Sequence, residues 1–234
     1  FADISDETWA RVMGVNLNGA FYCARQAVRA MQKVGNRGVV INVASTAAVY
    51  PIANEAMSEE HPTGPLDIYG TTKLATERFA SDFALRTGIA TIVGRFFNAF
   101  GPNETNPHLI PEIQRQVRAG QRVLRLGNLE PKRDFIHTSD MANAMDALLG
   151  AGLRGYHVFN IGRGIEYSVR EIVEAFERQL GEKLTIEVDP ARVRKVERMH
   201  LLADVRKLKQ ATGWEPMWGI DEGVATLLKE NLVK

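Results

Sequence analysis

Cysteine is nearly missing from this sequence, since Cys23 is the one thiol in 234 residues. A single thiol excludes an internal disulfide framework and a cysteine-rich metal site, so we expect a cytoplasmic protein without a bound metal. The chain also has no apolar run near the roughly 18 residues of a membrane-spanning helix, and it has no signal-peptide pattern. Its 29 basic and 28 acidic side chains give a formal net charge of +1, so bulk charge predicts no nucleic-acid or membrane partner.

The sequence does contain an alternation of helix-like and strand-like segments. Residues 5–33 are typical of an amphipathic helix with Ser5 as its N-cap, and residues 67–86 predict a second long helix. The β-branched apolar runs at 38–45 and 89–97 predict strands that are buried on both faces. Strand, helix and strand in this order predict an α/β fold with a parallel sheet and crossover helices.

The second half of the chain has a different texture. Shorter elements alternate with loops rich in Arg, Asn and Pro, and Ser168 with Glu171 predicts a capping box at the start of a helix. We therefore expect a sheet-forming part over residues 1–100. Residues 101–234 are expected to form mainly a smaller α/β subdomain, interleaved with the last elements of the sheet.

The segment DIYGTTK (residues 67–73) places Tyr69 and Lys73 on one face of the second helix. A tyrosine acts as a general base near neutral pH only if its pKa falls by roughly 3 units, about 4 kcal/mol, and a neighbouring ammonium stabilises the phenolate. Ser45 or Thr46, at the end of the preceding strand, supplies a hydroxyl. Together these groups would form a proton relay between an alcohol and a ketone. The alternative is an amphipathic side-chain pair on a surface helix.

Several segments resemble, in order and spacing, the short-chain dehydrogenase/reductase superfamily, in particular its extended branch of NAD-dependent nucleotide-sugar epimerases and dehydratases. They are VNLNG (15–19), ASTAAVY (44–50), YGTTK (69–73), RFFNAFGP (95–102), NPHLIPEI (106–113), LGNLEPKRDFIHTSD (126–140) and TGWEP (212–216). The resemblance implies a Rossmann-like doubly wound parallel sheet. Residues 1–100 would be the later part of the dinucleotide-binding domain with the catalytic residues, and residues 101–234 mainly a nucleotide-sugar-binding subdomain. It further implies NAD or NADP as cofactor and a homodimer formed through helices 5–33 and 67–87.

The resemblance also assigns catalytic roles. Tyr69 matches the family's base, and Lys73 matches its partner, which also binds the nicotinamide ribose. Thr46 is the first choice for the catalytic hydroxyl and Ser45 the second, because two alignments of the strand end are possible. Asn16 matches an asparagine that holds a proton-relay water, while the alternative is a helix asparagine that satisfies a local backbone group.

The second half resembles a clamp for a nucleotide diphosphate, the group that planar guanidinium side chains bind best. The positions that match are Asn98, His108, Leu109, Arg133, Arg194 and Glu197. In the family the arginines hold the pyrophosphate, Glu197 accepts from ribose hydroxyls, and the turn at His108 and Leu109 offers backbone amides. The alternative is that these arginines are solvated surface residues, with Asp134 as the partner of Arg133.

The residues after Thr46 bear on the reaction. Dehydratases of the family carry an acidic residue there, whereas this chain has Ala47 and Ala48, so dehydration is disfavoured. We expect a nucleotide-sugar epimerase that acts at C4, with a GDP-4-keto-6-deoxy-sugar reductase as the alternative. A GDP-sugar is weakly favoured as substrate.

The chain opens at Phe1 without an initiator methionine, and the family's glycine-rich turn G-x-x-G-x-x-G has no counterpart in these residues. This turn binds the cofactor pyrophosphate, so the sequence corresponds to the later part of the family pattern. A further alternative is therefore a truncated, non-catalytic module that binds a nucleotide sugar or assembles with another chain.

Overall fold

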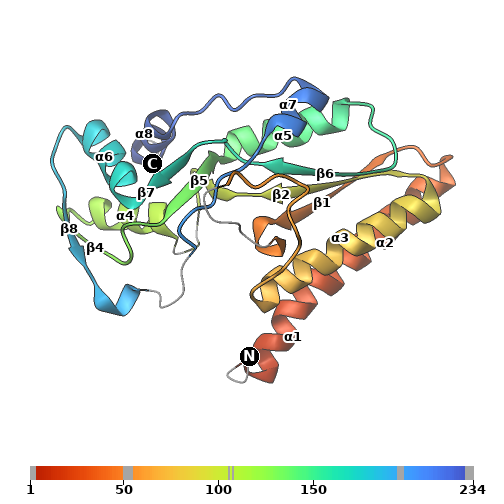
Figure 1. Ribbon diagram of the computed structural model, residues 1–234, viewed down its shortest axis with the longest axis horizontal. Helices are drawn as coiled ribbons and strands as arrows, with labels where there is room; N and C mark the ends of the chain where they lie inside the picture. The colour runs from red at the N-terminus through yellow and green to blue at the C-terminus, as the bar shows by residue number, and fades with distance from the viewer. Residues whose placement is uncertain (1–3, 50–54, 105, 107, 194–197, 230–234) are drawn as a thin grey trace.

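A parallel sheet forms the centre of the molecule, as the strand and helix pattern predicts. The computed structural model describes residues 4–49, 55–104, 106, 108–193 and 198–229. Strands β1 (Val39–Ser45), β2 (Ala90–Phe96) and β6 (Tyr156–Ile161) pair in parallel in the order β1-β2-β6. Helices α2 (Ala20–Lys33) and α3 (Ile68–Thr87) cover one face, and α5 (Thr138–Gly150) and α7 (Arg206–Thr212) cover the other (Figure 1). This is the doubly wound α/β arrangement.

The two predicted strands differ in burial. Strand β2 is buried along most of its length, as expected for the centre of a parallel sheet. The same prediction is wrong for β1, where Ala44 is buried but Val43 is 49% exposed. The physical reason is pairing, because within the described residues β1 is hydrogen-bonded to β2 alone and stands at the edge of the sheet.

The first predicted helix is divided by a wider turn. Ser5 caps α1 (Asp6–Met13) by accepting a hydrogen bond from the Thr8 amide at 3.2 Å, which confirms the predicted N-cap. A π-helical segment, Gly14–Gly19, then joins α1 to α2. Such segments bulge the helix and are found often at functional sites. The second predicted helix is α3, which ends at Gly88 in the left-handed conformation.

The rest of the chain forms a second, smaller group of elements. Strands β3 (Asn98–Phe100), β5 (Lys132–His137) and β7 (Glu166–Ser168) form a mixed sheet, and β4 (Val123–Leu126) pairs with β8 (Thr185–Val188). Helices α4 (Leu109–Arg118), α6 (Val169–Leu180) and α8 (Ile220–Lys229) share a hydrophobic core with these strands. The capping box of Ser168 and Glu171 at the start of α6 is confirmed.

A buried carboxylate joins the two groups of elements. Asp134 of β5 accepts hydrogen bonds from the backbone amides of Arg163, Gly164 and Ala203 at 2.7, 2.8 and 3.1 Å. Burial raises the pKa of Asp134 to about 6, against the opposing effect of these amides. Asp134 therefore fixes the segment after β6 and the segment at Ala203 to β5.

The packing of α8 predicts a sensitivity to one methyl group. A Cβ added at Gly223 would lie 2.5 Å from the buried ring of Phe100, so we expect Gly223→Ala to lower the free energy of unfolding by about 1–3 kcal/mol. Urea denaturation measures the change. Gly150→Ala is the matched control, since a Cβ at this helical glycine meets nothing within 4 Å. Equal stability of the two variants would contradict the close packing of α8.

Candidate active site

The first turn of α3 lies directly against the turn that follows β1. Asp67 caps α3 by accepting from the Gly70 amide at 2.6 Å. Gly70 is buried, and a Cβ at this position would overlap the carbonyl of Ala47 in the short helical turn Thr46–Ala48. The absence of a side chain at Gly70 therefore lets α3 approach the backbone next to Thr46.

Tyr69 and Lys73 project from this turn onto one side of α3. The Lys73 ammonium lies 5.5 Å from the centroid of the Tyr69 ring and donates to the carbonyl of Val43 in β1 at 3.2 Å. Partial burial lowers the pKa of Lys73 below the ordinary value of a lysine. The Tyr69 side chain is 40% exposed and is accessible to a ligand. The structure thus gives the phenol a fixed cationic neighbour.

The two candidate hydroxyls have different surroundings. Thr46 is 6% exposed and lies in the turn that touches α3. The Ser45 hydroxyl accepts from the Ala47 amide at 3.1 Å and so caps that turn. Each residue lies at the carboxyl end of β1 beside the first turn of α3, and the choice between them remains a prediction.

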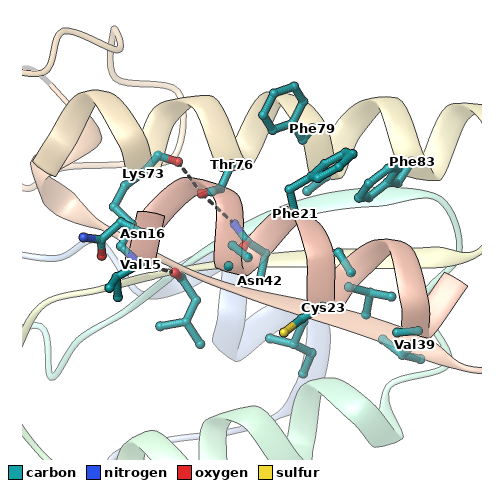
Figure 2. A pocket seen from close by; sticks show the side chains of 18 of the residues that line it. Val15, Asn16, Phe21, Cys23, Val39, Asn42, Lys73, Thr76, Phe79 and Phe83 are labelled. Atoms are coloured by element: carbon teal, nitrogen blue, oxygen red, sulfur yellow. Dashed lines mark hydrogen bonds between the residues drawn. The ribbon is translucent and has the colours of Figure 1, made fainter. Parts of the chain in front are cut away.

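Asn16 and Lys73 line one cavity of about 500 Å³ between α2, β1 and α3, which we call the Asn16 cavity (Figure 2). Its polar end holds these two residues and a hydrogen bond of 3.3 Å from Asn42 to Thr76, while apolar side chains, three of them phenylalanines, line much of the rest. The Asn16 amide donates to the Val12 carbonyl at 3.2 Å. Asn16, in the π-helical segment, thus bonds a nearby backbone carbonyl. This is the contact that the alternative prediction for Asn16 describes.

Four of the predicted substrate-binding residues surround a second hollow of about 420 Å³, which we call the Arg133 cleft. Asn98, His108, Leu109 and Arg133 all line it. The side-chain oxygen of Asn98 is buried and has no hydrogen-bond partner among the described residues. Arg194 and Glu197 lie outside the described residues, so their roles remain predictions.

The sequence interpretation missed further residues of the Arg133 cleft. Arg192 donates to Glu112 of α4 at 2.9 Å, and both residues line the cleft. Hydrogen bonds from Arg115 and Gln116, together with the charge of Arg192, lower the pKa of Glu112 to about 2. The signal for Arg192 was its place two positions before Arg194, in a segment that already pointed to the clamp.

Comparison with known proteins places this arrangement in a family. The chain belongs to the extended short-chain dehydrogenases/reductases, because the model of the GDP-mannose 4,6 dehydratase family matches residues 11–227. GDP-6-deoxy-D-mannose reductase from Pseudomonas aeruginosa is 28% identical over an alignment of 228 residues that covers 94% of this chain and 73% of that protein. UDP-glucose 4-epimerase from Corynebacterium glutamicum is 33% identical over 204 residues.

A solved structure shares the fold. RMD from Pseudomonas aeruginosa complexed with NADPH superimposes with a TM-score of 0.80 at 26% identity, over 91% of this chain and 71% of that chain. The Corynebacterium alignment covers 60% of that epimerase, so the chain spans only part of its length. In the described part of the chain, no helix is long and apolar enough to cross a membrane.

The contact at Gly70 yields a prediction. Gly70→Ala should move the first turn of α3 away from Thr46, because neither the Ala47 carbonyl nor Pro65 can give way easily. We expect a loss of about 1–3 kcal/mol in the free energy of unfolding, measured by urea denaturation. Arg78→Ala, at an exposed position of the same helix, should change this value by less than about 0.5 kcal/mol. A fully stable Gly70→Ala variant would show that α3 and Thr46 are not in close contact.

Proposed function

We propose that this chain carries the catalytic and substrate-binding part of an NAD(P)-dependent nucleotide-sugar epimerase that acts at a sugar hydroxyl carbon, with C4 as the expected position. The observation that supports it most is the first turn of α3, which holds the Tyr69 phenol next to the Lys73 ammonium and against the Thr46 turn. The phenol, the ammonium and a hydroxyl are the groups that proton exchange with a sugar hydroxyl requires.

The position of the two hollows supports the same function. Ser45 ends β1, and Asn98 begins β3 directly after β2, so both lie at the carboxyl ends of parallel strands. Ligands of open α/β sheets bind outside this edge. A nucleotide sugar with its diphosphate in the Arg133 cleft could then extend its sugar toward Tyr69.

The residues present fit the nicotinamide-ribose end of a cofactor. The half-buried Lys73 ammonium lines the Asn16 cavity and retains donors for ribose hydroxyls, since among the described residues it donates a hydrogen bond only to the Val43 carbonyl. When bound, the cofactor would accept hydride from the sugar carbon and return it. The solved relative with NADPH supports a nicotinamide cofactor, and NAD and NADP are both expected candidates.

The chain's own residues would handle the proton. Tyr69 takes the proton from the sugar hydroxyl as hydride leaves the same carbon, and it gives the proton back when hydride returns to the opposite face of the ketone. The Thr46 hydroxyl, or that of Ser45, donates a hydrogen bond to the same oxygen. The Lys73 ammonium stays beside the Tyr69 ring, 5.5 Å from its centroid. The net reaction inverts one carbon and leaves the cofactor unchanged.

A reductase that acts on a GDP-4-keto-6-deoxy sugar is the second candidate. It is favoured because the Pseudomonas GDP-6-deoxy-D-mannose reductase aligns with 94% of this chain. Dehydration is disfavoured by Ala47 and Ala48, which supply no acid or base beside Thr46.

The weak preference for a GDP-sugar and the homodimer both remain predictions. Trp9 and Tyr22 are exposed along the helices expected to form the dimer.

The reaction is tested with the purified full-length protein, NAD(P)+ or NADPH, and UDP- or GDP-sugars. We expect an epimer to form without net change in absorbance at 340 nm, and Tyr69→Phe to slow turnover by roughly 100- to 10,000-fold while nucleotide-sugar binding remains. Stoichiometric loss of NADPH with a keto sugar would favour the reductase. Wild-type turnover in Tyr69→Phe would contradict the catalytic assignment. Binding without any turnover would favour the non-catalytic module.

Diphosphate binding is tested by calorimetry with UDP and GDP. Arg133→Ala should weaken binding by roughly 10- to 100-fold, because a charge-assisted hydrogen bond contributes about 1.5–3 kcal/mol. The matched control is Arg122→Ala, which removes an arginine paired with Glu182 outside the Arg133 cleft. If both variants bind equally well, the cleft is not the diphosphate site. A difference between the two nucleotides identifies the preferred base.

A further inference from the structure

A buried ion pair joins the catalytic helix to the sheet one turn beyond Lys73. Arg95 of β2 and Glu77 of α3 are 4% and 3% exposed. Two parallel hydrogen bonds connect them, from the Arg95 Nε to Oε1 of Glu77 and from Nη2 to Oε2, each 2.9 Å long. This planar two-point contact fixes direction as well as distance.

The same guanidinium holds the segment that leads into α3. Its Nη1 donates to the backbone carbonyl of Glu59 at 3.1 Å. The Glu59 carboxylate in turn accepts from the Asn160 amide of β6 at 2.8 Å, and the Asn160 side chain donates to the Met57 carbonyl at 2.7 Å. The loop before α3 is therefore tied to both β2 and β6.

This loop also contacts the Thr46 turn. The Gly64 amide donates to the carbonyl of Ala48 at 3.2 Å, and Val49 forms a bridge with Thr63. These hydrogen bonds and the backbone between them therefore connect Arg95 to both sides of the candidate site. One side carries Tyr69 and Lys73, and the other carries Thr46.

We propose that Glu77 and Arg95 are positioning residues that set the register and rotation of α3, and with them the geometry of Tyr69 and Lys73 relative to Thr46. This inference rests on the proposed function. Among the described residues, the other side-chain hydrogen bonds between α3 and the sheet are single and longer: 3.2 Å from Lys73 to Val43, 3.3 Å from Asn42 to Thr76 and 3.4 Å from Tyr156 to the Glu77 carbonyl. A displacement of about 1 Å in a catalytic group can slow a reaction by roughly 100-fold.

Stability alone does not account for the pair. Removing two charges from water is costly, and well-packed apolar residues of similar volume often replace a buried ion pair without loss of stability. This property separates positioning from folding in an experiment. Glu77→Leu combined with Arg95→Met should retain the fold but lose the directional contact.

The experiment compares this double variant with the wild-type full-length protein. We expect a thermal midpoint within a few degrees of the wild type, a kcat lowered by roughly 10- to 100-fold and a KM changed by less than about 3-fold. Glu77→Asp, which keeps the charge opposite Arg95 but shortens the side chain and disturbs the two-point contact, should recover part of kcat, and it replaces the double variant if the latter does not fold. Asp82→Asn is the matched control, since it breaks an exposed pair with Arg86 on the same helix and should change nothing. A wild-type kcat in a folded double variant or in Glu77→Asp would overturn the proposal.

A second readout does not depend on turnover. The rate of acetylation of the Lys73 amine is followed by mass spectrometry as a function of pH. The midpoint of this profile follows the pKa of the amine, which depends on the surroundings of Lys73. In the double variant the midpoint should move toward that of a free lysine, whereas the exposed Lys183 should be unaffected. An unchanged Lys73 profile overturns positioning. A shifted profile in a protein whose wild type turns over no nucleotide sugar supports positioning and refutes the proposed function.

Discussion

The candidate site depends on the docking of α3 against the carboxyl ends of β1 and β2. Gly70 permits contact with the Ala47 carbonyl, and the Glu77–Arg95 pair fixes the helix one turn beyond Lys73. Lys73 lies between these two contacts, and Tyr69 directly precedes Gly70. A short stretch of one helix therefore carries the reactive groups and the groups that hold them.

The parallel sheet explains why distant segments meet there. Parallel strands end at one edge, so the hydroxyls after β1 and the start of β3 after β2 lie at the same side of the sheet. The smaller group of elements adds the Arg133 cleft, where Arg192 and Glu112 connect η3 (Pro190–Arg192) to α4. Asp134 fixes this group to the segments that follow β6.

Local sequence signals predicted local structure well. The cap at Ser5, the capping box of α6 and the extent of α3 follow from side chains within a few residues of each helix end. The prediction that β1 is buried on both faces was wrong, because the burial of a strand depends on which strands pair with it. The π-helical segment around Asn16 was also not predicted, since no local pattern in the sequence distinguishes it from an α-helix.

The parts of the site that were missed depend on contacts between distant segments. The Glu77–Arg95 pair left a signal, because an arginine inside the apolar run TIVGRFF requires a buried partner. That signal does not name Glu77. The Tyr69–Lys73 pair and a hydroxyl from Ser45 or Thr46 were predicted from the sequence, whereas the contact of Gly70 with the Ala47 carbonyl required the fold.

The most direct measurement is a crystal structure of the full-length protein with NAD(P)+ and a slowly reacting nucleotide sugar. We predict that one sugar hydroxyl oxygen lies within about 3 Å of both the Tyr69 phenol and a hydroxyl of Thr46 or Ser45, with the diphosphate in the Arg133 cleft. A diphosphate bound elsewhere, or a sugar beyond the reach of Tyr69, would contradict this account.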